Sequence, residues 1–232
     1  MLETYGKLLV RLLLTAVLFA ICFLWGTKEV FSPGAYAQPS LILDAGHGGE
    51  DGGTVGIDGT IESDINLSIA LKAAELSRFL GWNTYMTREA DISIHDQTAN
   101  TLREKKVSDL KNRVKICNQF ENGILISIHQ NALPGSPKTK GAQVFYNEQE
   151  GSAELAYAIQ KVFNDTLNLD TPKDARRIGS SSYLMKNVSC RAVLIECGFL
   201  TNLEETVLLN NDSYQMKISL RIISAISEHL SN

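Results

Sequence analysis

The stretch LILDAGHGG, residues 41–49, passes from an apolar run directly into a glycine cluster. A short apolar run that is closed by glycines predicts a buried β-strand. Downstream, apolar residues recur at steps of four, four, three and four, at Ile65, Ile69, Ala73, Leu76 and Leu80. This spacing places them on one face of a helix. Residues 82–87 alternate in polarity and predict a second strand. The order strand, helix, strand predicts two parallel strands that are joined by a crossover helix.

Strand-like and helix-like segments continue to alternate through the rest of the chain. Helical spacing predicts further helices at residues 107–120, 152–167 and 214–230. β-branched and apolar content predicts further strands at residues 123–128, 142–146, 183–185 and 192–196. The segments 147–151 and 169–182 are typical of loops. We therefore expect a single α/β domain over residues 38–232, with a mostly parallel central sheet that is flanked by helices.

Residues 1–37 differ in composition from the rest of the chain. Two basic residues precede fifteen uncharged residues, Leu12 to Gly26, which predict an N-terminal hydrophobic helix that directs export. Counted from Leu8, the apolar stretch has 19 residues, about 28 Å as a helix, so it could be an uncleaved membrane anchor. The small-x-small sequence at residues 35–37 favours a cleaved signal peptide instead, although its last residue lies eleven positions beyond the end of the apolar run. Signal peptide and anchor both remain open, with the rest of this segment as a linker.

The charge and the cysteines of the chain exclude several classes of protein. Its 22 basic and 26 acidic residues give a net charge of −4 without a long block of one sign, whereas a nucleic-acid partner requires a basic patch. After residue 37 the cysteines are Cys117, Cys190 and Cys197. An odd number without CxxC spacing is against a disulfide framework and against a cysteine-rich zinc site. We expect these cysteines to be small buried apolar residues, with metal capture by Cys197 as the alternative.

Polar residues that follow predicted strands are the candidates for chemistry, because ligands of open α/β sheets gather at the carboxyl ends of the strands. His47 follows the first strand, His129 follows the central strand and Glu196 ends a late strand, while Glu62 opens the helix after the glycine loop. Two imidazoles and one carboxylate form a set with which a catalytic Zn²⁺ keeps a fourth position open. His47, Glu62 and His129 are therefore the candidate metal ligands. Glu196 is the candidate catalytic residue, which would move the proton of the attacking water.

Each of these residues also has a structural interpretation. A histidine at a strand end can be a hydrogen-bonded structural residue, and a glutamate at a helix start suits the helix dipole. The glycines of residues 46–53 could cradle a phosphate, but the loop lacks a Gly-Lys-Ser/Thr ending and a G-x-G-x-x-G helix entry. Together, four suitable residues at strand or helix ends favour a metal hydrolase, and the residues alone lead no further.

Several motifs occur in a fixed order along the chain. They are LDAGHGG at 43–49 with Asp51 and Gly53, Glu62 with Asn66 and Leu67, Thr87 and Arg88 with Asp91, Arg113, SIHQNA at 127–132, Gly141 with Tyr146, and ECGFLTN at 196–202. With these motifs, nearly everything after Pro39 resembles the zinc-dependent N-acetylmuramoyl-L-alanine amidases of the AmiC-like class. The resemblance implies that His47, Glu62 and His129 bind zinc and that Glu196 is the catalytic carboxylate.

At five further positions the sequence departs from the family pattern or has more than one interpretation. Gln130 stands where the family often has alanine, and Thr201 stands where it often has serine. Arg88 and Arg113 either contact anionic groups of the substrate or form ion pairs that hold strand ends in place. Asn131 either orients the histidine two residues before it, or the substrate, or serves in a turn.

The resemblance implies hydrolysis of the amide between the lactyl group of N-acetylmuramic acid and L-alanine of the peptidoglycan stem peptide. The alternatives are another zinc peptidase or deacylase and, from a different class, a catalytically inactive cell-wall-binding scaffold. Only eleven residues separate His129 from Gly141 and the amidase-like segment follows the leader directly, so we expect neither an inserted helix nor wall-binding repeats. This compact form is most similar to the spore-cortex amidases, which prepare the formation of muramic-δ-lactam for germination.

The leader and the substrate together predict where the protein acts. We expect it outside the cytoplasm, either secreted or at the outer face of the cytoplasmic membrane, and in a spore-forming bacterium between the two forespore membranes. Peptidoglycan is the expected partner, and the membrane is a second one if the leader is not cleaved. Targeting would then depend on that segment or on an accessory envelope protein.

Overall fold

The computed structural model describes residues 39–179 and 182–231 of the 232-residue chain. The hydrophobic helix that the sequence predicts within residues 1–37 lies outside the described residues. Among the helices of the described part, none combines the length and the apolar character that a membrane span requires.

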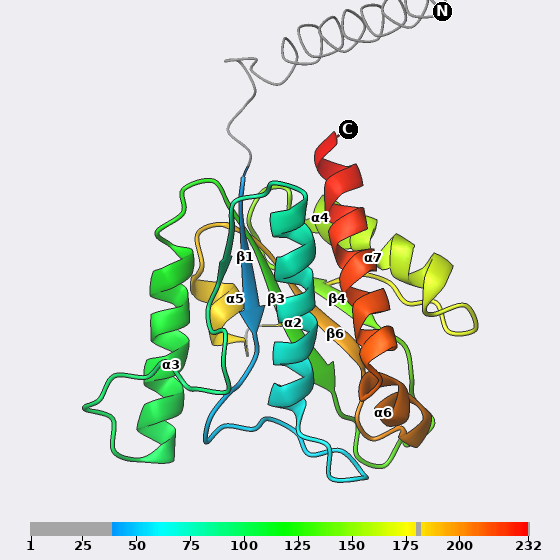
Figure 1. Ribbon diagram of the computed structural model, residues 1–232, viewed down its shortest axis with the longest axis horizontal. Coiled ribbons are helices and arrows are strands. Elements are labelled where there is room, and N and C mark those ends of the chain that lie inside the picture. The colour runs from blue at the N-terminus through cyan, green and yellow to red at the C-terminus, as the bar shows by residue number, and fades with distance from the viewer. Residues whose placement is uncertain (1–38, 180–181, 232) are drawn as a thin grey trace, which may run out of the picture. The chain divides into compact units, whose positions relative to one another are not determined.

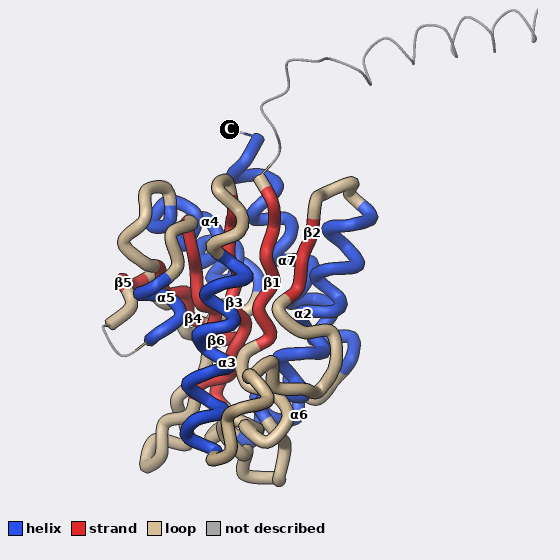
Figure 2. Tube along the Cα trace, turned by 90° about the vertical axis from the view of Figure 1, so that its left-hand side faces the viewer, coloured by secondary structure: helices blue, strands red, loops and turns tan. Residues whose placement is uncertain are grey.

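A six-stranded sheet in the order β2-β1-β3-β6-β4-β5 forms the centre of the domain (Figures 1 and 2). Its strands are β1 (Ser40–Ala45), β2 (Thr84–Met86), β3 (Gly123–Asn131), β4 (Gln143–Tyr146), β5 (Arg176–Arg177) and β6 (Arg191–Phe199). The neighbours β2, β1, β3 and β6 are parallel, whereas β4 runs antiparallel to β6 and pairs in parallel with β5. The predicted mostly parallel sheet is therefore confirmed.

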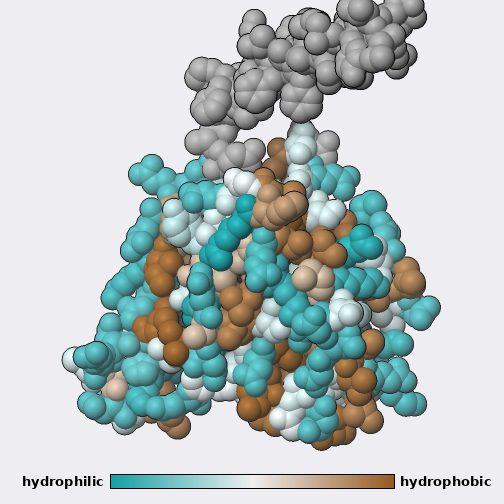
Figure 3. Space-filling view, viewed as in Figure 1, coloured by the Kyte–Doolittle hydropathy of each residue, from teal (hydrophilic) through white to brown (hydrophobic). Residues whose placement is uncertain are grey.

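Helices cover both faces of this sheet. They are α2 (Glu62–Phe79), α3 (Leu102–Cys117), α4 (Ser152–Thr166), α5 (Tyr183–Asn187), α6 (Leu203–Leu209) and α7 (Asp212–Ser231). Helices α2, α4 and α7 lie on one face, and α3 and α5 lie on the other (Figure 2). Figure 3 shows polar residues over much of the outer surface on the side of α2, with apolar groups between them, as amphipathic helices require.

The alternating strand side chains build two apolar cores, one on each face. In β1, Leu41 and Leu43 are buried in the core beneath α2, α4 and α7. Ile42, between them, is buried in the smaller core beneath α3 and α5. A strand that is apolar on both faces has a continuous apolar run in its sequence. For this reason residues 41–43 could be recognised as a strand.

The sequence-based prediction is wrong for residues 183–185, which form part of helix α5 rather than a strand. Leu184 and Met185 are both buried in the smaller core, and two successive residues of a strand would point to opposite faces. Helix α3 begins earlier than predicted, at Leu102, because Thr101 and Glu104 form a capping box. Helix α6 and the two-residue strand β5 occur in segments whose sequence predicts neither.

The parallel strands β1, β3 and β6 end at the same edge of the sheet, the lower edge in Figure 1. Residues that lie at or after these ends are therefore close in space although they are far apart in the sequence. The polar candidates His47, His129 and Glu196 all belong to this edge.

Candidate metal centre

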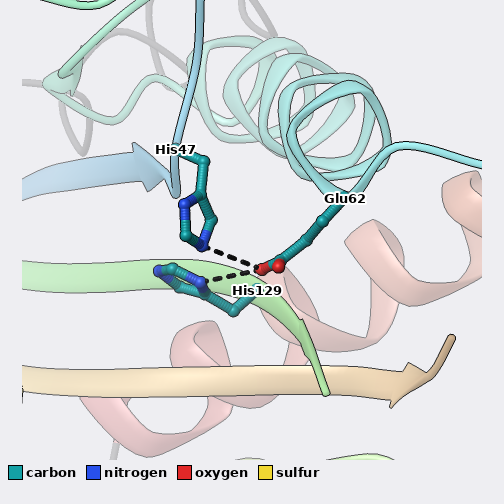
Figure 4. A group of neighbouring side chains, drawn as sticks. All are labelled: His47, Glu62 and His129. Carbon is teal, nitrogen blue, oxygen red and sulfur yellow. Dashed lines mark hydrogen bonds and ion pairs between the residues drawn. The ribbon is translucent and has the colours of Figure 1, made fainter. Parts of the chain in front are cut away.

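His47, Glu62 and His129 come together at the carboxyl edge of the sheet (Figure 4). His47 lies in the turn after β1, Glu62 is the first residue of α2, and His129 lies near the end of β3. Nε2 of His47 is 3.4 Å from Oε1 of Glu62, and Nδ1 of His129 is 3.0 Å from the same oxygen. The two imidazole rings meet edge to face with their centroids 5.1 Å apart. The structure thus brings the three predicted ligands to one point.

The donor atoms of the three side chains are close enough together to share one metal ion. One ligand atom from each side chain lies within 4.8 Å of the other two, and zinc with bonds of about 2.0–2.1 Å spaces its donors roughly 3.4 Å apart. Three protein donors leave a fourth position for a reactant. Across the described residues, no other group of three histidine, cysteine, aspartate or glutamate side chains has this arrangement. Cys197 is not part of it and is buried in the main core, as expected for a small apolar residue.

Asp51 orients the His47 ring and alters its protonation. Nδ1 of His47 is 3.0 Å from Oδ2 of Asp51, which leaves Nε2 to face Glu62. Burial lowers the pKa of His47, but the hydrogen bonds to Asp51 and Glu62 outweigh burial and raise that pKa to about 9. Nζ of Lys106 lies 3.1 Å from the same carboxylate oxygen of Asp51. A carboxylate that binds the outer nitrogen of a metal-facing histidine is the usual way to fix its tautomer.

The turn that carries His47 is constrained by its backbone contacts. His47 has φ of 62°, in the left-handed region that non-glycine residues seldom adopt. Its carbonyl oxygen accepts a hydrogen bond from Nη2 of Arg113 at 2.7 Å. Immediately after it, Gly48 and Asp51 form a small antiparallel bridge. The surrounding contacts therefore hold His47 in a conformation that the isolated chain would disfavour.

Several donors hold the carboxylate of Glu62 in place. Oε2 accepts from the backbone N–H of Thr54 at 2.9 Å. Oε1 accepts from Nδ2 of Asn66 at 3.3 Å and from the backbone N–H of Gln130 at 3.2 Å. Burial raises the pKa of Glu62, but hydrogen bonds from the two histidines outweigh burial and hold that pKa well below its usual value. Glu62 is therefore ionised and presents a negative charge to a cation.

Two glycines make room for these ligands. A Cβ atom at Gly46 would lie 2.2 Å from the His129 ring. A Cβ atom at Gly53 would lie 2.6 Å from Oε2 of Glu62 and 2.8 Å from the His47 ring, and the φ of Gly53 is +73°. Distances below 3.0 Å are too short for a Cβ contact, so glycine is required at both positions by the ligands themselves.

Glu196 lies beside this group on strand β6, directly opposite His129 in the register with β3. Its Oε2 atom is buried and finds no hydrogen-bond partner among the described residues. Burial raises the pKa of Glu196 to about 7. A partnerless carboxylate with a raised pKa, next to a candidate metal site, has the properties of an acid/base group.

A family model described as N-acetylmuramoyl-L-alanine amidase matches residues 41–228. The chain belongs to this amidase family. It is 39% identical over 189 residues to the germination-specific N-acetylmuramoyl-L-alanine amidase of Bacillus subtilis (strain 168), with 80% of this chain and 77% of that protein covered. It is 27% identical over 229 residues to the amidase AmiA of Escherichia coli (strain K12), with 80% and 74% covered.

Solved structures of amidases share the fold. The CwlD amidase from Clostridioides difficile, solved in complex with the GerS lipoprotein, has a TM-score of 0.79 and 38% sequence identity. This similarity covers 84% of the present chain and 99% of that one. The catalytic domain of the amidase CwlV from Bacillus (Paenibacillus) polymyxa has a TM-score of 0.70 and 26% identity, over 84% and 99% of the two chains.

In this amidase, the two arginines singled out in the sequence support the loop that bears His47. Arg113 pairs with Asp44 and Asp109 at 2.6 Å each. Arg88 donates to four backbone carbonyl oxygens around the glycine loop. Both arginines are buried, at 1% and 3% exposure. Arg113 forms the ion pairs of the structural interpretation, whereas Arg88 supports the loop through hydrogen bonds to backbone carbonyl oxygens instead.

A cavity of 170 Å³ adjoins the candidate metal centre of the amidase on the side of α3 and α5. His47 and His129 form part of its wall, together with Lys106, Tyr183 and Leu194. The cavity therefore offers a cation, a hydroxyl group and an apolar surface next to the candidate ligands. Such a mixture suits a polar substrate that must be oriented as well as bound.

Three residues that hold the ligands have no role in the sequence-based prediction: Asp51, Asn66 and Gln130. Asn66 lies four residues after Glu62 in α2, a spacing that places two side chains side by side on a helix. That signal was available in the sequence. Asp51 in an irregular loop and Gln130 on a strand give no comparable signal, because their contacts depend on how separate elements pack.

Proposed function

We propose that this amidase is zinc-dependent and hydrolyses the amide between the lactyl group of N-acetylmuramic acid and L-alanine of the peptidoglycan stem. His47, Glu62 and His129 would hold the zinc ion, and Glu196 would be the catalytic carboxylate. The single observation that carries the proposal is the convergence of these three donors with Glu196 beside them. The donor set of two imidazoles and one carboxylate is suited to catalytic zinc.

The chemistry divides between the ion and the protein. Zinc bound at this site supplies a Lewis acid that polarises the amide carbonyl and increases the acidity of a water molecule. Glu196 takes a proton from the attacking water and delivers it to the nitrogen of L-alanine as the C–N bond breaks. In the metal-free site, burial raises the pKa of Glu196 to about 7, a direction that suits a group which must both accept and donate a proton. Asp51 keeps His47 in the required tautomer throughout.

Two alternatives differ from this proposal in their products. Another zinc peptidase or deacylase could use the same four residues on a different bond. A cell-wall scaffold without catalysis would bind the polymer and leave it intact. Glu196 disfavours the scaffold. Its buried Oε2 atom has no partner among the described residues, which costs folding free energy. A protein that only binds the polymer has no use for such a group.

Digestion of purified peptidoglycan distinguishes these possibilities. We expect the zinc-loaded protein to release stem peptides with a new L-alanine amino terminus and to leave the glycan strands intact. Glu196→Gln protein, loaded with zinc in the same way, is the matched control. Cleavage inside the peptide would identify a peptidase, new reducing sugar ends a glycosidase, and an unchanged polymer a scaffold; each of these results would reject the proposal.

We further propose that the reaction prepares muramic-δ-lactam in the spore cortex. Removing the stem peptide frees the lactyl carboxylate, which a sugar amine exposed by a separate deacetylase could then capture as the lactam. Similarity to the germination-specific amidase of Bacillus subtilis and to CwlD supports this role. The short connection from β3 to β4, in which residues 132–142 contain no helix, also fits a compact amidase of this kind.

The spore role requires a genetic test. Deletion of the gene in a spore-forming bacterium should leave growth nearly normal, remove muramic-δ-lactam from the cortex and impair germination. Muropeptide analysis of mutant spores provides the measurement. Lactam at the wild-type level, in a strain without a related amidase, would reject the spore role and leave the enzymatic assignment unaffected.

The proposed substrate lies outside the cytoplasm, and we propose that residues 1–37 take the catalytic domain, residues 38–232, there. The protein would be secreted or held at the outer face of the cytoplasmic membrane, and in a sporulating cell it would lie between the forespore membranes. CwlD was solved with a lipoprotein, and a comparable accessory envelope protein is proposed here. Fractionation should place the protein outside the cytosol, and its intact mass should show whether the leader is cleaved.

A further inference from the structure

A buried chain of amide groups connects strand β3 to the carboxylate of Glu62. Nε2 of Gln130 donates to Oδ1 of Asn66 at 3.1 Å. Nδ2 of Asn66 in turn donates to Oε1 of Glu62 at 3.3 Å and to the carbonyl oxygen of Gly46 at 3.1 Å. Gln130 and Asn66 are 3% and 0% exposed. Solvent therefore cannot substitute readily for any member of this chain.

This chain of amide groups acts on the carboxylate oxygen of Glu62 that faces the two histidines. Oε1 is the atom that lies 3.4 Å from His47 and 3.0 Å from His129. The same atom accepts from the side chain of Asn66 and from the backbone N–H of Gln130. Both donors therefore determine where the negative charge of Glu62 points.

Gln130 also determines which way the Asn66 amide is turned. An asparagine side chain can exchange its oxygen and nitrogen by rotating through half a turn. Here the N–H₂ group of Gln130 faces Oδ1 of Asn66, so the rotated amide would place two donor groups against each other. The side chain of Gln130 and the carbonyl oxygen of Gly46 thus both favour the orientation that directs Nδ2 at Glu62.

The arrangement has a cost to the fold. Oε1 of Gln130 is buried and has no hydrogen-bond partner within the part of the chain that the structure describes. A buried carbonyl oxygen without a partner destabilises the folded state. An apolar side chain of similar size would fill the same space and remove this orphaned oxygen, but it would leave Oδ1 of Asn66, a residue that is 0% exposed, without its donor. The net effect of Gln130 on the metal-free fold is therefore small, and its contact with Asn66 is better explained by the orientation of Glu62.

We propose that Gln130 is a positioning residue for the metal centre, which acts through Asn66 to aim the carboxylate of Glu62 at the ion. The inference rests on the proposed metal-binding role of Glu62. Residues that orient a metal ligand contribute roughly ten- to hundredfold to metal affinity. Gln130 should therefore determine how tightly zinc is held, more than how stable the metal-free protein is.

Gln130→Met tests this division. Methionine has a similar length and volume but cannot donate to Asn66. We expect the full-length variant to bind zinc about ten- to hundredfold more weakly in competition with a chelator, whereas its metal-free melting temperature should fall no further than that of Gln160→Met. The matched control is Gln160→Met in α4, because Gln160 is also 3% exposed and makes hydrogen bonds with Val144 and Ala142 away from the ligands. That variant should lose stability and keep its zinc affinity.

A double-mutant cycle tests whether the effect passes through Asn66. In an Asn66→Ala background, Gln130→Met should cause no further loss of zinc affinity, whereas independent effects would multiply. Wild-type zinc affinity in folded Gln130→Met, or multiplying effects in the cycle, would overturn the inference. If Gln130→Met does not fold, Gln130→Leu replaces it, and failure of both would show that Gln130 serves the fold. Absence of zinc binding by the wild type would instead reject the proposed metal centre itself.

Discussion

Arg113 and Asp44 form an ion pair inside the protein, with Nη1 of Arg113 2.6 Å from Oδ1 of Asp44 and the side chains 2% and 1% exposed. Burial raises the pKa of Asp44, but the charge of Arg113 and the hydrogen bond from Ser127 outweigh it and lower that pKa to about 2. Arg113 also binds the carbonyl oxygen of His47. The pair therefore connects the interior of the sheet to the turn that presents the first candidate ligand.

Removing Arg113 should destabilise the protein severely. Arg113→Met leaves Asp44 buried without its counter-charge, which typically costs about 3–5 kcal/mol. Urea unfolding of the metal-free protein measures the loss. In the control variant Lys161→Met, the lost partner of Asp165 belongs to an ion pair whose side chains are 78% and 60% exposed, and the change should stay below about 1 kcal/mol. Similar small losses in both variants would show that the buried pair contributes little.

His47→Ala or His129→Ala should remove both the bound metal and the activity. Either change leaves only two protein donors of the three that converge here, which is too few for a catalytic zinc site. Metal content of the purified variants and release of stem peptides measure the two effects. His229→Ala, at the end of α7, serves as the control and should retain both. Full activity of either ligand variant, or of protein treated with a chelator, would contradict a metal mechanism.

Glu196→Gln should separate catalysis from metal binding. Glutamine is nearly the same shape but cannot accept a proton, so the rate should fall roughly 10²-fold or more. Zinc content should stay at the wild-type level because Glu196 is not among the converging donors. Normal turnover by this variant would assign Glu196 a structural role.

The same variant should be the more stable protein at high pH. Burial raises the pKa of Glu196 to about 7 in the folded state. The folded state therefore binds a proton that the unfolded state has already released, so its stability declines as the pH rises from the usual glutamate range through about 7. Above pH 7, metal-free Glu196→Gln should exceed the wild type by roughly 2–3 kcal/mol, and the two should converge at pH 4. Parallel stability curves would show that Glu196 is solvated.

Zinc affinity should increase with pH, because the ion must displace a proton from His47. The pKa of His47 is raised to about 9 in the metal-free site, whereas Glu62 is already ionised. Displacement of one proton gives about a tenfold gain in apparent affinity per pH unit until about pH 9. Calorimetric titrations in buffers of different ionisation enthalpy should detect this proton release. An affinity that does not depend on pH would mean that His47 is neutral before zinc binds.

The sheet and the candidate ligands could be predicted because each depends on short-range patterns. The apolar run at residues 41–43, closed by glycines, indicated a strand, and the positions of His47 and His129 followed from the shared edge of parallel strands. Residues 183–185 were misassigned because so short an apolar segment fits either a strand or one turn of helix, and only packing against the smaller core decides between them. The contact between Gln130 and Asn66 joins residues 64 positions apart, and no local pattern could reveal it.

Gly46 and Gly53 carry no functional group, yet the candidate metal ligands occupy the space that these two residues leave open. A single methyl group at Gly46 would occupy the place of the His129 ring, and one at Gly53 would displace Glu62. In a survey of all single substitutions, these two positions should accept as few replacements as the histidines. At Gly53 the positive φ adds backbone strain to the close contact, whereas at Gly46 the close contact acts without it. An attempt to adapt this fold to a larger ion or a new reaction would therefore have to consider the space at Gly46 and Gly53 before the ligands are changed.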